Sequence, residues 1–247
     1  ICAALSSNPT TLICPDTNRD IEATVGCLNA LGARITRTVD GYSIEPIQNV
    51  PQRAVLECCE SGSTLRFLLP IVGALGVDAT FQMAGRLSRR PLSPLWEEME
   101  RMGCTLSRPA ADTIRCCGKL KAGNYEISGN VSSQFITGLL YALPLLEQDS
   151  VLEVIPPLES KAYIEMTLEA LELYGIKVEK KENTYYILGN QTYQAVRGAV
   201  EGDYSNAAFL DAFNLIGGEV KVEGLKEDSL QGDKIYREYF HMLQSSA

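Results

Sequence analysis

A recurring order of secondary structure, with a period of about 70 residues, constrains the fold of this chain more than any other sequence feature. Apolar spacing and turn residues predict the order helix, strand, helix, strand, strand in three stretches, which begin at residue 1, near Ser61 and near Ser132. Serines near helix starts keep this spacing, since 133 − 63 = 70 and 205 − 133 = 72 for Ser63, Ser133 and Ser205. Each stretch needs its neighbours to bury its apolar residues, so the repeat predicts one closed α/β (α+β) domain.

The predicted elements define where this domain ends. We predict helices over residues 1–6, 20–31, 61–75, 92–102, 132–146 and 161–174, and strands over 10–14, 33–38, 42–45, 78–83, 104–107, 113–117, 150–155, 176–179 and 185–188. A fourth copy begins at 203–205, with a strand at 219–222 and a helix from Lys234. Residues 191–202 are polar and contain Gly198 and Gly202, which suits a crossing between domains. We therefore predict a threefold-repeat domain at 1–198, its first helix truncated, and the beginning of a second domain of the same type at 199–247.

The charge balance argues against nucleic acid and membranes as partners. With 22 Lys and Arg against 31 Asp and Glu, the formal net charge is −9, and such a field repels nucleic acid and anionic lipid surfaces. No apolar run in the sequence reaches the roughly 20 residues that span a bilayer. We expect a cytoplasmic protein with neither kind of partner.

The histidine and cysteine pattern supports neither a metal nor another cofactor. His241 is the single histidine and no C-x-x-C motif occurs, which argues against a zinc site and against histidine acid/base chemistry. The eight cysteines include the adjacent pairs Cys58-Cys59 and Cys116-Cys117, a spacing poorly suited to ordinary disulfides. We expect eight reduced structural thiols and no cofactor, so any chemistry must use carboxylates, Lys, Arg and hydroxyls.

Hydroxyl and amide groups gather at predicted helix starts. Ser132, Ser133 and Gln134 open a helix that is otherwise apolar, and serines also lie at the start near residue 61 and at Ser160. The first N–H groups of a helix have no internal partner and carry the positive end of its dipole, so these residues can receive a phosphate. The alternative is a simple N-cap, in which the serine accepts a bond from the backbone two or three residues later.

Two further positions suit an anionic ligand. Gly62 would let a ligand approach the backbone closely, although a glycine at a helix start needs no ligand. Residues 86–91, R-L-S-R-R-P, form the densest basic cluster, and Arg90 is followed by Pro91. A guanidinium can hold a carboxylate or phosphate through two hydrogen bonds, while the alternative is a solvated basic loop. Arg66, within an apolar helix, is expected to have a structural partner.

These residues together resemble one enzyme family. The segments are E-S-G-S-T-L-R-F at 60–67, R-R-P-L at 89–92, V-S-S-Q-F-I-T-G-L-L at 131–140, E-S-K-A-Y-I at 159–164 and E-G-D-Y-S-N-A-A-F at 201–209. They resemble 5-enolpyruvylshikimate-3-phosphate synthase (3-phosphoshikimate 1-carboxyvinyltransferase). The resemblance implies transfer of enolpyruvyl from phosphoenolpyruvate to the 5-hydroxyl of shikimate 3-phosphate with release of phosphate, a step in chorismate and aromatic amino-acid biosynthesis. It also implies a cleft between two domains, each a threefold repeat.

The resemblance assigns roles to individual residues. Shikimate 3-phosphate is expected to contact Ser132, Ser133, Gln134, Ser160 and Tyr163, and phosphoenolpyruvate is expected to contact Gly62, Arg90 and Gln134. Two positions depart from the family, which usually has asparagine in place of Glu60 and threonine in place of Ser63. A carboxylate at Glu60 would repel an anionic ligand unless it is turned away or protonated.

Other functional positions of the family match no residue of this chain. The Lys-Ser pair and the following arginine correspond to positions before Ile1, and the catalytic Asp and Glu correspond to positions after Ala247. The chain is therefore expected to be a monomeric fragment that binds substrate without turnover and holds no catalytic residue. Two alternatives stay open: a UDP-N-acetylglucosamine enolpyruvyl transferase, which has a reactive cysteine where residues 84–89 read A-G-R-L-S-R, and a non-catalytic binding module.

Overall fold

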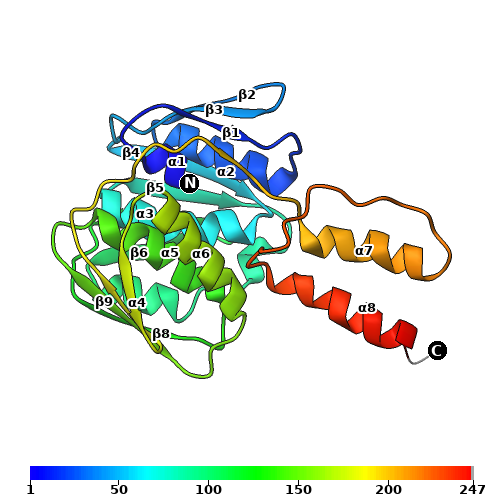
Figure 1. Ribbon diagram of the computed structural model, residues 1–247. Coiled ribbons are helices and arrows are strands. Elements are labelled where there is room, and N and C mark those ends of the chain that lie inside the picture. Colours follow the sequence, from blue (N-terminus) through cyan, green and yellow to red (C-terminus); the bar gives the residue numbers. More distant parts are fainter. Residues whose placement is uncertain (246–247) are drawn as a thin grey trace.

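Three sheets with one topology form the body of the molecule. The computed structural model describes residues 1–245 (Figure 1), and within them each sheet has four strands. The sheets run β12 (Gly198–Ala199), β1 (Thr10–Ile13), β3 (Gly41–Glu45), β2 (Arg34–Arg37); then β4 (Arg53–Cys59), β5 (Asp78–Met83), β7 (Thr113–Gly118), β6 (Cys104–Ala110); and β8 (Asn124–Ser128), β9 (Ser150–Ile155), β11 (Thr184–Ile187), β10 (Val178–Lys181). The first two strands of each sheet are parallel, and the other pairs are antiparallel. The predicted threefold repeat is confirmed.

Each repeat contains one more strand than the sequence analysis predicted. β4 and β8 precede the inner helices and were missed, although β4 alternates regularly between exposed and buried residues. Ala54, Leu56 and Cys58 point into the core, and the neighbouring positions face outward, as a half-buried strand requires. The repeating unit is therefore strand, helix, strand, helix, strand, strand.

The first sheet takes its leading strand from a segment 186 residues later in the sequence, since 198 − 12 = 186 for the paired residues Gly198 and Leu12. Leu12 pairs with Gly198 and Ile13 with Ala199 in a parallel ladder, and Thr10 donates a side-chain hydrogen bond to the carbonyl of Val196 at 2.6 Å. The segment predicted to cross between domains thus also completes the first sheet. The predicted boundary between residues 198 and 199 falls inside β12, and the division into two domains stays a prediction.

The helices lie between and against the sheets. They are α1 (Cys2–Leu5), α2 (Arg19–Ala30), α3 (Gly62–Leu75), α4 (Leu95–Arg101), α5 (Ser133–Ala142) and α6 (Lys161–Leu173), with short 3-10 turns η1 (Leu87–Arg89) and η2 (Leu143–Leu145). α3 and α5 are buried on most of their surface, and they pack together in the middle of the body, with α6 beside α5 (Figure 1). One continuous hydrophobic core joins residues from all three sheets.

Close helix packing explains a glycine in α5. A side chain at Gly138 would overlap the carbonyl oxygen of Arg66 in α3 and would lie 3.1 Å from Cγ of Pro70. Glycine therefore lets the two helix backbones meet. On the other side of α5, the hydroxyls of Thr137 and Thr167 lie 2.9 Å apart and join it to α6.

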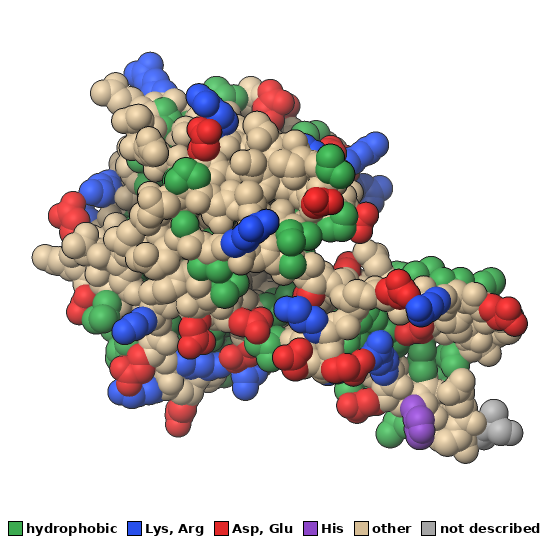
Figure 2. All heavy atoms as spheres, turned by 45° about the horizontal axis from the view of Figure 1, so that its top comes forward, with side chains coloured by type: hydrophobic (Ala, Val, Ile, Leu, Met, Phe, Trp, Pro, Cys, Tyr) green, Lys and Arg blue, Asp and Glu red, His purple; other side chains and the backbone are tan. Residues whose placement is uncertain are grey.

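A smaller unit extends from this body. It consists of α7 (Tyr204–Leu215), the turn η3 (Gly232–Ile235) and α8 (Tyr236–Ser245) (Figure 1). Its own small core contains Tyr204, Ala207 and Tyr236. Phe209 and Ile216 of α7 are 77% and 84% exposed, and a row of hydrophobic side chains lies along the upper edge of this unit in Figure 2.

The strand predicted at 219–222 and the start of the helix predicted from 92 differ from the structure. The predicted strand at 219–222 is wrong, because the amide of Asn214 bonds both the N–H and the carbonyl of Val220 at 2.8 Å and so occupies the groups that a strand would pair. The helix predicted from 92 begins at Leu95, because Pro94 disfavours helical backbone at Ser93. In the described part of the chain, no helix has the length and apolarity that crossing a membrane requires.

Candidate functional site

A cavity of about 910 Å³ lies beside the starts of α2, α3 and α5. Its wall includes Gly62, Arg90 and Gln134, the three residues predicted to contact phosphoenolpyruvate. These residues come from the start of α3, the loop after η1 and the first turn of α5. The fold thus brings together three segments that the sequence separates by many residues.

The start of α3 is capped by its own hydroxyls. The side chain of Ser61 accepts a hydrogen bond from the N–H of Thr64 at 3.3 Å and one from the Thr64 hydroxyl at 2.8 Å. The Thr64 hydroxyl also lies 2.7 Å from the hydroxyl of Thr24, which fixes α3 against α2. Ser61 and Thr64 are buried, and Ser61 acts as the N-cap of this helix.

Gly62 makes room for Arg90. A Cβ atom added at Gly62 would lie 2.8 Å from Nη1 of Arg90 and 3.9 Å from Nη1 of Arg66. The two guanidinium groups therefore lie over the first residue of α3. Among the described residues, Arg90 makes no direct ion pair with a carboxylate, so its guanidinium is available to a ligand in the cavity.

Arg66 joins the two sides of the site. Its Nη1 donates to Oε1 of Gln134 at 2.8 Å and its Nη2 donates to the carbonyl of Pro91 at 3.3 Å. Burial, followed by the nearby charge of Arg90, lowers the pKa of Arg66 below its ordinary value. The structural partner expected for Arg66 is Gln134, which is itself a predicted site residue. The sequence did not identify this partner. The four-residue spacing from Gly62 was the available signal, since it places both on one helix face.

The start of α5 combines a cap with a free hydroxyl. Ser132 is the N-cap, and its side chain accepts a hydrogen bond from the N–H of Gln134 at 3.3 Å. Ser133 is the first residue of the helix and is partly exposed. Its hydroxyl makes no hydrogen bond to another residue within 1–245, so it is available to a ligand.

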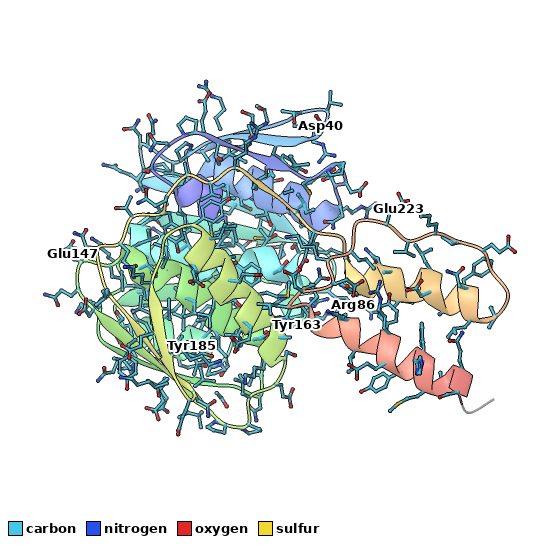
Figure 3. All side chains as sticks on the ribbon, viewed as in Figure 1. Asp40, Arg86, Glu147, Tyr163, Tyr185 and Glu223 are labelled. Carbon is cyan, nitrogen blue, oxygen red and sulfur yellow. The ribbon has the colours of Figure 1, made fainter. Side chains whose placement is uncertain are left out.

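Ser160 and Tyr163 lie apart from the cavity. Both are exposed and belong to the start of α6, where Ser160 has left-handed backbone angles, φ 54° and ψ 40°, and its side chain caps no N–H. The hydroxyl of Tyr163 donates to Oδ2 of Asp233 at 3.0 Å. Burial, and then this bond, raise the pKa of Tyr163. Figure 3 shows Tyr163 near the beginning of α8, so the side chain of Tyr163 faces the smaller unit.

Carboxylates also line this cavity. Asp20, Glu22, Glu57 and Glu60 contribute to its wall together with Arg19. The carboxylate of Glu60 lies over Gly85. A Cβ atom added at Gly85, whose φ is +55°, would overlap this carboxylate. Within residues 1–245, no cluster of His, Cys, Asp and Glu has the arrangement of a metal site. The donors that this cavity offers to an anion include Arg90 and Gln134.

Comparisons with known proteins agree with one another. The family model described as EPSP synthase (3-phosphoshikimate 1-carboxyvinyltransferase) matches residues 1–244. The 3-phosphoshikimate 1-carboxyvinyltransferases of Clostridium kluyveri and Clostridium beijerinckii are 41% and 39% identical to this chain, over 95% of it and 56% of each relative. The solved EPSP synthase of Acinetobacter baumannii has a similar fold, with a TM-score of 0.70 at 20% identity over 84% of this chain and 47% of that one. The chain thus spans about half the length of the relatives it matches.

Proposed function

Because the chain belongs to the EPSP synthase (3-phosphoshikimate 1-carboxyvinyltransferase) family, we propose that its cavity holds phosphoenolpyruvate beside shikimate 3-phosphate. The whole protein would transfer enolpyruvyl to the 5-hydroxyl of shikimate 3-phosphate and release phosphate, in chorismate and aromatic amino-acid biosynthesis. The observation that carries this proposal is the meeting of Gly62, Arg90 and Gln134 on one cavity wall.

Phosphoenolpyruvate is assigned to the side of Arg90. Its carboxylate and phosphate need donors with fixed directions, which a guanidinium and a side-chain amide provide. The nearby start of α3 adds the positive end of a helix dipole. The carboxylates that also line the cavity would repel an anion, which favours a position beside Arg90.

Shikimate 3-phosphate is assigned to the starts of α5 and α6. Ser132, Ser133 and Ser160 would bind its phosphate, Tyr163 would lie beside its ring, and Gln134 would contact both substrates. The free hydroxyl of Ser133 and the open start of α5 support the phosphate position. The hydroxyl of Tyr163 donates a hydrogen bond to Asp233. A ligand beside Tyr163 would therefore have to leave this hydrogen bond in place or replace Asp233 as its acceptor.

For the printed chain we propose substrate binding without turnover. The reaction removes a proton from the 5-hydroxyl and adds one to the methylene carbon, so an acid and a base must flank the two substrates. The cavity wall supplies Arg90 and Gln134 for binding, and no residue in it is assigned to proton transfer. We also propose a cytoplasmic monomer that uses no cofactor, nucleic acid or membrane.

Calorimetric titration of the chain tests this function. We expect binding of shikimate 3-phosphate and of phosphoenolpyruvate, and no binding of a UDP-sugar. A hydrogen bond to a charged group contributes ~1.5–3 kcal/mol, so Ser133→Ala should weaken shikimate 3-phosphate binding roughly ten- to a hundredfold. Arg90→Met should abolish phosphoenolpyruvate binding.

Arg89→Met is the matched control, because Arg89 is an exposed arginine of the same loop and does not line the cavity. It should bind both substrates like the unmodified chain. Preference for the UDP-sugar would favour the related UDP-N-acetylglucosamine transferase. Phosphate release from phosphoenolpyruvate that depends on shikimate 3-phosphate would refute the proposal of binding without turnover.

A further inference from the structure

Arg66 contacts Gln134 and the residue next to Arg90, and Gln134 and Arg90 are two of the three residues that the proposed function assigns to phosphoenolpyruvate. One arm of its guanidinium reaches Gln134, and the other reaches the carbonyl of Pro91, the residue that follows Arg90. Its guanidinium carbon also lies 5.3 Å from the centre of the Phe135 ring. Arg66 is therefore fixed from three directions, and it links α3 to α5 and to the loop that carries Arg90.

The chemistry of this contact determines how Gln134 is oriented. An arginine side chain has hydrogen-bond donors and no acceptor, whereas a glutamine amide has an acceptor oxygen at one end and two donors at the other. The atom that faces Arg66 at 2.8 Å must therefore be Oε1. The Nε2 group is turned away from Arg66, and within residues 1–245 it donates no hydrogen bond to the protein.

An anionic ligand requires this orientation. A carboxylate or phosphate accepts hydrogen bonds, so it is stabilised by the Nε2 end of the amide and repelled by the Oε1 lone pairs. A free amide could rotate and present either end to the cavity. We propose that Arg66 is a positioning residue, which fixes the side-chain amide of Gln134 so that its donor end is offered to the anion held by Arg90. This inference rests on the proposed function of the cavity.

The placement of two guanidinium groups supports the proposal. Arg66 and Arg90 both lie over Gly62, and their like charges repel each other without an anion nearby. Arg66 offsets part of this cost through its bonds to Gln134 and to the Pro91 carbonyl. An anion bound beside Arg90 would relieve the remaining repulsion, which couples ligand binding to the geometry that Arg66 maintains.

A thermodynamic cycle tests whether Arg66 acts through Gln134. Phosphoenolpyruvate is titrated into the unmodified chain, Arg66→Met, Gln134→Met and the double variant. We expect Arg66→Met to weaken binding at least tenfold in the unmodified chain and less than threefold when Gln134 is already methionine. Equal losses in the two backgrounds would overturn the proposal, because Arg66 would then act without the amide.

A second variant keeps the test decisive if Arg66→Met unfolds. Gln134→Glu retains the contact with Arg66 and has nearly the same shape, but it replaces the donor amide by acceptor oxygens. We expect this chain to stay folded in thermal unfolding and to lose phosphoenolpyruvate binding at least tenfold. Binding as tight as in the unmodified chain would show that no donor of Gln134 faces the ligand, which would overturn the proposal.

A measurement without ligand separates this inference from the proposed function. The side-chain amide of Gln134 should be ordered in ¹⁵N relaxation of the unmodified chain, and Arg66→Met should make it as mobile as the amide of the exposed Gln48. Arg89→Met should leave Gln134 ordered. If the unmodified chain binds no phosphoenolpyruvate, the proposed function fails while an ordered, Arg66-dependent amide still supports positioning. An amide of unchanged mobility in Arg66→Met would refute positioning.

Discussion

Replacing Gly138 by alanine tests the close packing of α3 on α5. The new Cβ would overlap the carbonyl oxygen of Arg66 and would lie 3.3 Å from its carbonyl carbon and 3.1 Å from Cγ of Pro70. Two of these atoms are backbone, so α3 must shift as a whole. Overpacking of this kind costs ~1–3 kcal/mol, while alanine in a helix interior gains ~0.5–1 kcal/mol over glycine. The net expectation is a loss of about 1–2 kcal/mol.

The assay is thermal unfolding, with Gly26→Ala as the matched control. Gly26 lies inside α2, and an added Cβ would meet no atom within 4 Å. That variant should therefore show the propensity gain alone and raise the melting temperature. For a chain of this size ~1 kcal/mol corresponds to roughly 2–4 °C, so Gly138→Ala should melt about 2–8 °C lower than the unmodified chain. A rise in melting temperature for Gly138→Ala, as for Gly26→Ala, would refute the packing argument.

Three further results are expected. In Gly62→Ala, the new Cβ 2.8 Å from Nη1 of Arg90 should displace that guanidinium and weaken phosphoenolpyruvate binding in calorimetry without lowering the melting temperature; unchanged affinity would contradict the placement of Arg90. An aromatic disulfide reagent should react first with the exposed Cys59, and the five buried thiols should react after unfolding; rapid labelling of all eight cysteines would contradict the core. The bond from Arg115 holds the pKa of Asp78 below its usual value, so this group stabilises the fold above pH ~4 and loses its effect as the pH falls through its folded-state pKa. Asp78→Asn should therefore lower the melting temperature at pH 7 more than near pH 3, and equal losses at the two pH values would be inconsistent with the ion pair.

The repeat could be predicted from sequence because it depends on local patterns. Apolar spacing located the inner helices at Ser61 and Ser132 to within one residue of the α3 and α5 starts. The leading strand of the first sheet could not be found in the same way. β12 has two residues, and Gly198 pairs with Leu12 across the whole length of the domain, so it depends on tertiary contact and has no local pattern of its own.

Only part of the candidate site could be predicted, because helix starts have a local sequence pattern and contacts between distant residues do not. Each helix start was visible in the sequence, and three predicted residues do share one cavity wall. The spacing from Gly62 could have placed Arg66 at the site, but its contact with Gln134 could not be predicted, because the two residues are 68 apart in the sequence. The separation of Ser160 and Tyr163 from the cavity depends on how α6 packs against α5 and against the segment containing Asp233, which is again a tertiary property.

The repeat and the site are related through equivalent positions. Ser61 and Ser132 are the N-caps of α3 and α5, an offset of 132 − 61 = 71, so Gln134 follows its cap by two residues as Ser63 does in α3. The hydroxyl of Ser63 lies 3.2 Å from the hydroxyl of its own N-cap Ser61, whereas Gln134 accepts a hydrogen bond from Arg66 of α3 at 2.8 Å. A short hydroxyl at this position therefore stays within its own helix start, and a longer amide reaches the neighbouring helix. Because the amide has a second end, the contact in α5 leaves a donor for a ligand.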